Sequence, residues 1–148
     1  PRTRPHDRQT LKDVIGHLKD KKPSKTTRAS KRTDNHEYLE ESFSPHFMSR
    51  NRVRGWNEQS FTLLAMARHT VLHPQAPKMI KVEKDRMKFK HGSTNLYRRL
   101  TVRECAAIQT FPDDFKFEYK NWKDYLFLSA LTICLVVKAI KIYPYNIL

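Results

Sequence analysis

The centre of the chain interleaves aromatic side chains with arginines and is broken by prolines. Between residues 38 and 82, five aromatic residues are mixed with four arginines. Pro74 and Pro77 lack the amide hydrogen that a helix interior needs, so no long helix can pass through them. The β-prone runs Ser60–Leu64 and Met79–Val82 are separated by turn residues. This region is therefore predicted to be a small, irregular module of strands and loops.

A helix is expected on each side of this module. Apolar residues at helical spacing follow Thr10 and predict a short helix from Leu11 to about Lys19, with Thr10 as its N-cap. The sequence Thr101–Glu104 forms a capping box, in which the threonine hydroxyl and the glutamate carboxylate bind free backbone N–H groups. Pro112 is expected to end this second helix, and a polar turn should follow it. The fold class is therefore predicted to be α+β.

The chain carries a large positive charge, which bears on its partners. Its 148 residues include 29 Lys and Arg against 15 Asp and Glu, a net charge of +14. Nucleic acid, an anionic membrane surface and a ribosome-like scaffold all fit this charge. The basic stretch Lys21–Arg32 is expected to be a solvated loop and not a specific DNA contact. Cys105 and Cys134 lack the spacing of a disulfide framework or a zinc cluster, so a cytoplasmic location is expected.

Several kinds of chemistry are not expected. The only glycines, Gly16, Gly55 and Gly92, are too scattered to build a phosphate-binding loop, so no nucleotide-cofactor site is predicted. His69 and His73 have the spacing of metal ligands on a helix, but Pro74 argues against a helix there. They are interpreted as ordinary polar or DNA-facing residues, and no metal is expected. Cys105 lies beside an alanine on an amphipathic helix and is interpreted as a small packing residue, not a nucleophile.

Three arginines alternate along one segment. In an extended chain Arg50, Arg52 and Arg54 point the same way. Such guanidinium groups can bind the O6 and N7 atoms of guanine in the major groove. They can equally bind phosphates, and the pattern by itself leaves the two interpretations open.

The sequence from Tyr97 to Phe115 closely resembles the ninth conserved motif of DNA (cytosine-5)-methyltransferases. Ala107 departs from the motif, where arginine is usual. The matching residues are Arg99, Leu100, Thr101, Arg103, Glu104, Cys105, Ala106, Gln109, Phe111 and Pro112.

The resemblance extends upstream to the target-recognition region of bacterial enzymes that methylate GGCC. It is seen in residues 35–38, 47–54 and 73–77. The resemblance implies that Arg50, Arg52 and Arg68 read guanines. It further implies a role in contacting the DNA backbone or supporting the lobe for Arg54, Thr62, Arg99, Thr101 and Arg103.

The same resemblance implies a two-lobed enzyme whose large, Rossmann-like lobe binds S-adenosylmethionine and carries the nucleophilic cysteine. The chain contains none of the large-lobe motifs. We therefore expect a small DNA-recognition lobe that is inactive alone and has double-stranded DNA as its partner. It is either a subunit completed by a separately encoded catalytic chain or the remnant of a disrupted gene, and the sequence leaves both open. The expected division is a basic linker (1–33), the target-recognition region (34–96), the ninth motif (97–124) and a tail (125–148).

The tail departs from the family, because the apolar run Tyr125–Val137 stands where the tenth motif is expected. Its thirteen residues are fewer than the ~20 of a membrane-spanning helix, so a buried helix is favoured over a membrane anchor. Two other functions stay open. One is a stand-alone basic DNA-binding protein with no role in methylation, and the other is a membrane-associated basic peptide.

Overall fold

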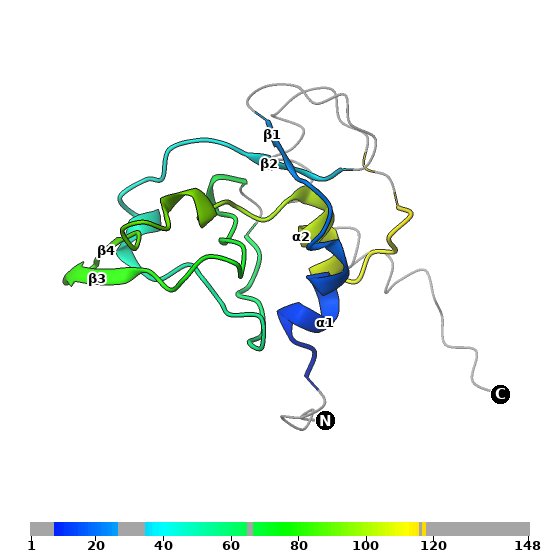
Figure 1. The fold of residues 1–148 in the computed structure, drawn as a ribbon, viewed down its shortest axis with the longest axis horizontal. Coiled ribbons are helices and arrows are strands. Elements are labelled where there is room, and N and C mark those ends of the chain that lie inside the picture. The colour runs from blue at the N-terminus through cyan, green and yellow to red at the C-terminus, as the bar shows by residue number, and fades with distance from the viewer. Residues whose placement is uncertain (1–7, 27–34, 65–66, 116, 118–148) are drawn as a thin grey trace.

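A computed structural model of the protein describes residues 8–26, 35–64, 67–115 and 117 (Figure 1). Two short helices, two pairs of short strands and several 3₁₀ turns make up this part of the chain, which agrees with the predicted mixture of helix and strand. The helices are α1 (Leu11–Ile15) and α2 (Val102–Ile108). The strands are β1 (Ser24–Thr26), β2 (Glu37–Leu39), β3 (Ile80–Glu83) and β4 (Arg86–Lys88). The 3₁₀ turns are η2 (Gly16–Leu18), η3 (Phe47–Ser49), η4 (Ala67–His69) and η5 (Thr94–Leu96).

Both helices begin at a capping box; the box at Thr101 and the N-cap at Thr10 were predicted, and the return bond from Asp13 was not. The Thr10 hydroxyl accepts from the amide of Asp13 at 3.4 Å, and the Asp13 carboxylate accepts from the amide of Thr10 at 2.8 Å. Thr101 and Glu104 repeat this exchange at 3.1 and 2.8 Å. Each such cap stabilises its helix by about 0.5–2 kcal/mol.

The predicted helix ends need correction. The first helix is α-helical only to Ile15 and continues as η2 to Leu18. Helix α2 ends at Ile108, before Pro112, so the proline is not what ends it. Thr110 has a left-handed backbone with φ 65° and turns the chain out of the helical path first. The turn expected after the proline is present at Asp113 and Asp114.

One pair of strands joins segments that are adjacent in the sequence, and the other joins segments that are separated by a longer stretch of chain. β3 and β4 form an antiparallel hairpin with Ile80 opposite Lys88, which confirms the strand predicted at Met79–Val82 to within a residue. β1 pairs in parallel with β2, with Ser24 opposite Glu37. The expectation of a loop throughout Lys21–Arg32 is therefore wrong at its start, because β2 supplies a partner that the local sequence does not reveal. Residues 27–34 lie outside the described residues.

The predicted strand at Ser60–Leu64 is wrong. This stretch has no strand partner in the part of the chain that the structure describes, and it runs as irregular chain. Its apolar side chains Phe61 and Leu63 instead pack against one of the two core clusters. A β-prone sequence becomes a strand only where a second segment offers free backbone N–H and C=O groups.

Two apolar clusters form the core, and the segment from Val71 to Leu72 joins them. The first cluster is Phe47, Val53, Leu72, Ala76, Met79 and Tyr97. The second is Leu11, Ile15, Val71 and Leu100 and lies against the two helices. In Figure 1 the helices α1 and α2 lie side by side, and the hairpin β3–β4 projects at the opposite end. Within the described residues, no helix is long and apolar enough to cross a membrane. The apolar run 125–137, for which a buried helix is expected, lies outside those residues.

Candidate nucleic-acid interface

Arg50 and Arg52 leave the turn η3 side by side. Arg50 is exposed on an extended backbone, with φ −139° and ψ 158°. Arg52 is half-buried and lies over the ring of Phe47, 5.2 Å from its centroid. Burial, and after it the positive charge of Arg50, lowers the pKa of Arg52. In the part of the chain that the structure describes, no carboxylate pairs with either guanidinium, which leaves two adjacent cations facing solvent.

Backbone carbonyls hold one edge of the Arg52 guanidinium. Its Nε donates to the carbonyl of Phe47 at 3.0 Å and its Nη2 to the carbonyl of His46 at 3.3 Å. The Nη1 group makes no hydrogen bond to the described residues. The planar group is therefore oriented by the turn while its far edge stays available, as bidentate recognition of a base or a phosphate requires.

Asn51, between the two arginines, points inward. Its Oδ1 accepts from the amides of Met79 at 3.0 Å and Val53 at 3.4 Å, and its Nδ2 donates to the carbonyl of Val53 at 2.8 Å. These bonds fasten the arginine segment to the start of β3. Asn51 is not among the residues predicted from the sequence, although the alternation that turns Arg50 and Arg52 outward also turns their common neighbour inward.

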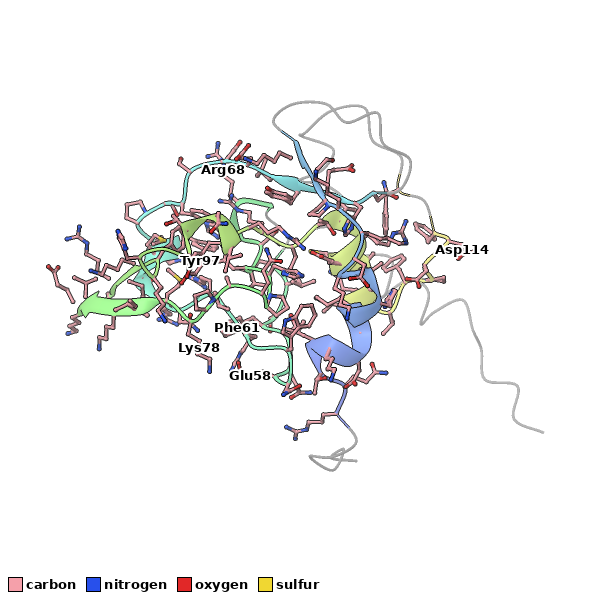
Figure 2. All side chains as sticks on the ribbon, viewed as in Figure 1. Glu58, Phe61, Arg68, Lys78, Tyr97 and Asp114 are labelled. Carbon is pink, nitrogen blue, oxygen red and sulfur yellow. The ribbon has the colours of Figure 1, made fainter. Side chains whose placement is uncertain are left out.

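Arg54 and Thr62 lie elsewhere on the surface. The Arg54 guanidinium is 4.2 Å from the centroid of the Phe61 ring and 3.5 Å from Glu58, which also binds Lys78 at 3.2 Å. Figure 2 shows Glu58, Phe61 and Lys78 along one edge of the molecule. Thr62 is exposed on the irregular stretch that follows. Arg54 therefore does not extend the pair at Arg50 and Arg52 as a third equivalent cation.

Arg68 stands on the turn η4 with its side chain 60% exposed. Its Nε lies 2.6 Å from a carboxylate oxygen of Glu41, so the ion pair occupies one edge of the guanidinium. The turns η4 and η3 are neighbours, since the rings of His69 and His46 are 5.7 Å apart. Residues 65 and 66, which precede this turn, lie outside the described residues.

Arg99 is buried between the segments that carry these arginines. It is only 2% exposed. Its guanidinium lies 4.2 Å from the ring centroid of Phe43 and 5.8 Å from that of Phe47. It donates four hydrogen bonds to backbone carbonyls, at distances of 2.8–3.3 Å, and we call these acceptors the Arg99 carbonyl cluster: Leu39, Glu41, Ser42 and Arg68. One side chain thus ties η4 to the segment that leads from β2 into η3.

Arg103 and Thr101 are also inside the fold. Arg103 donates to the carbonyls of Phe115 at 2.6 Å and Pro112 at 3.3 Å, and to Oδ1 of Asn35 at 3.3 Å. The Thr101 hydroxyl lies 3.2 Å from Nδ1 of His36. These contacts fasten α2 to the start of β2 and to the chain that follows α2.

Glu104 is the centre of a buried ionic network. It is 1% exposed and binds the guanidinium of Arg98 through two bonds of 2.8 and 2.7 Å. Burial raises the pKa of Glu104, but the hydrogen bond and the charge of Arg98 outweigh it, so the net pKa is lowered. A carboxylate held this way stays ionised and fully bonded, which does not suit an acid or base in catalysis.

His73 belongs to the same network and does not face DNA, which corrects that part of its interpretation. It is 2% exposed, its Nε2 is 3.5 Å from Glu104, and its ring meets that of Trp56 edge to face at 5.2 Å. Burial lowers the pKa of His73 to about 4. The described residues contain no group of three or more His, Cys, Asp or Glu placed to hold a metal.

A cavity beside α1 does not have the lining that S-adenosylmethionine needs. This cavity of about 490 Å³ opens between α1 and the end of α2, lined by Arg8, Gln9, Thr10, Leu11, Val14, Gln59, Ser60 and Ile108. It offers no carboxylate to bind ribose hydroxyls or an amino group, and it adjoins no glycine-rich loop. Burial raises the pKa of the Cys105 thiol far above its ordinary value, so this cysteine is not a reactive thiolate.

Comparison with known proteins defines the class to which this fold and surface belong. A profile of the C-5 cytosine-specific DNA methylase family matches residues 1–145, and the chain belongs to that family. It is 52% identical over 123 residues to the Type II methyltransferase M.FnuDI of Fusobacterium nucleatum. It is 53% identical over 119 residues to M.MthTI of Methanothermobacter thermautotrophicus and 51% identical over 121 residues to M.NgoPII of Neisseria gonorrhoeae, both also Type II methyltransferases. These matches cover 80%, 78% and 80% of the chain but 36% of each relative, so the chain spans about a third of their length.

Proposed function

We propose that this chain is the DNA-recognition part of a DNA (cytosine-5)-methyltransferase from a restriction-modification system, with GGCC as its target. The observation that carries the proposal is the Arg99 carbonyl cluster, which fixes the backbone of Arg68 beside the turn from which Arg50 and Arg52 emerge. A rigid frame below exposed arginines is what base recognition needs, because a mobile guanidinium loses conformational entropy on binding.

We assign the candidate residues to three groups. Arg50, Arg52 and Arg68 are exposed or half-exposed and would read guanines. Arg99 and Arg103, with Thr101, have their polar groups engaged inside the protein and would support the lobe without touching DNA. Arg54 and Thr62, at the surface, would contact the DNA backbone.

The rest of the reaction is assigned to other parts of the enzyme. We propose that S-adenosylmethionine and the flipped cytosine are bound by a catalytic lobe of the kind that the family implies, in the same polypeptide or in a separately encoded one. The whole enzyme would act in the cytoplasm on double-stranded DNA. The part described here would hold the duplex in register while that lobe carries out the transfer.

Substitution of Arg52 tests the recognition role, and a lysine at the same position is its matched control. The two variants are placed in a full-length relative that carries residues 35–96 of this chain, and affinity is measured for a GGCC duplex and a scrambled one. Because a bidentate arginine–guanine pair contributes ~1–3 kcal/mol, Arg52→Ala should reduce the preference for GGCC by roughly five- to a hundredfold.

Arg52→Lys keeps the charge but lacks the planar fork, so it should lose the preference for GGCC while retaining affinity for the scrambled duplex. If Arg52→Ala weakens both duplexes alike and Arg52→Lys restores both, Arg52 is a phosphate contact and the base-reading role is wrong.

A further inference from the structure

The hairpin β3–β4 is the most exposed cationic element among the described residues. Every residue from Ile80 to Arg86 is exposed. Between residues 81 and 90 the sequence has five cations and two acids. Among the described residues, the only ion pair of the hairpin joins Arg86 to Glu83 at 3.7 Å with both side chains largely in solvent, a contact that contributes little. The remaining cations have no acidic partner in the described structure: Lys81, Lys84, Lys88 and Lys90.

The hairpin is fixed firmly at its root to the segment that carries the proposed base-reading arginines. Met79, the residue before β3, is 6% exposed, and its amide donates to Asn51 at 3.0 Å. Its sulfur accepts from the amide of Arg52 at 3.4 Å. Directly after β4, Phe89 stacks on Tyr97 with the ring centroids 4.3 Å apart. Figure 1 shows the hairpin projecting from this root, at the end of the molecule away from α1.

The strand register places Arg86 and Lys88 on the outer face of the hairpin, and Lys81, opposite Met87, on the other face. Met87 and its neighbour Phe89 pack toward the first core cluster. Ile80 lies opposite Lys88, and Glu83 lies opposite Arg86. Because side chains alternate along a strand, these four lie on the face of the hairpin opposite to the one that carries Met87. A rigid arm with unpaired lysines suits a regular array of negative charge, and lysine binds phosphate as a compact point charge.

We propose that the hairpin β3–β4 binds the phosphate backbone of the DNA duplex beside the recognition sequence, through Lys84 and Lys88 and their neighbouring cations. This inference rests on the proposed DNA-recognition function. The root contacts through Asn51 and Met79 then set the distance between the phosphates that the hairpin binds and the bases that Arg50 and Arg52 read. Phosphate contacts of this kind fix register and carry no sequence information.

The test measures how the DNA affinity of the full chain depends on salt. Lys84→Ala/Lys88→Ala removes two charges from the hairpin. Arg8→Ala/Lys12→Ala removes two exposed charges beside α1 and is the matched control. When log affinity is plotted against log salt concentration, each lost phosphate contact makes the slope about 0.9 less steep. The drop in affinity between 50 and 200 mM salt then becomes about 3.5-fold smaller for each contact that is lost. We expect the hairpin variant to flatten the slope by about 1–2 and the control to leave it unchanged.

The outcomes separate this inference from the function on which it rests. If both variants flatten the salt dependence equally, or if the hairpin variant does not flatten it, the hairpin inference is wrong, but the proposed DNA-binding function is not affected. If the unaltered chain shows no salt-dependent binding to duplex DNA, the proposed function fails as well. Ile80→Ser/Val82→Ser removes the exposed apolar residues of β3. A loss of DNA affinity there that exceeds the loss in the lysine variant would identify an apolar docking surface and overturn the phosphate role.

Discussion

Replacing Arg99 by lysine should destabilise the protein by about 3 kcal/mol. The arginine spans four carbonyls from two separate segments, and the ammonium group of lysine donates from a single point. Two or three of these hydrogen bonds would be lost, at a net ~1 kcal/mol each. The 4.2 Å contact over Phe43 would lose its stacked geometry, at a cost of roughly 0.5–1 kcal/mol.

Urea denaturation of the full chain, followed by tryptophan fluorescence, measures this loss. With a dependence on urea of ~1–3 kcal/mol per molar, the unfolding midpoint should fall by about 1–3 M. Arg86→Lys, at an exposed site on the hairpin, is the control and should not move the midpoint. If Arg99→Lys shifts the midpoint no more than this control does, water satisfies the Arg99 carbonyl cluster and Arg99 does not hold the recognition segments together.

Three further results are expected. Glu104→Gln should destabilise the protein by about 3–5 kcal/mol in the same urea titration, because it leaves the Arg98 charge buried without its partner. Asp113→Asn, at an exposed position, is the control and should leave the unfolding midpoint unchanged. The pKa of His73 is lowered to about 4 in the folded state, from 6.5. Between pH 4 and 6.5 the unfolded chain therefore binds a proton on His73 that the folded protein does not bind. The free energy of unfolding should therefore fall by up to about 3 kcal/mol as pH drops through that range, and a His73→Asn variant whose pH profile is just as steep would contradict this. Finally, the purified chain should transfer no label from S-adenosylmethionine to duplex DNA, and any transfer that Cys105→Ala abolishes would show that this buried thiol reacts after all.

The sequence by itself determined the features whose partners are a few residues apart. Both capping boxes join residues at positions i and i+3, so the starts of α1 and α2 could be predicted. The hairpin near Met79–Val82 also forms from neighbouring segments. The long match to the ninth motif gave the family, and the excess of lysine and arginine gave the class of partner.

The tertiary structure decided which charged residues are interior. From composition, Arg99, Arg103 and Glu104 belong at the surface, since a lone buried charge is costly. They are buried because carbonyls and charges from residues up to 68 positions away surround them, a condition that no local pattern contains. Long-range partners also explain why β1 formed where a loop was expected, while Ser60–Leu64 did not form a strand. A strand needs the edge of a second strand to pair with, and only the folded chain determines which segments have one. It also decided that Arg52 lies fixed on the turn η3 while Arg54 packs on Phe61, because each guanidinium binds whichever ring and carbonyls the fold brings within reach.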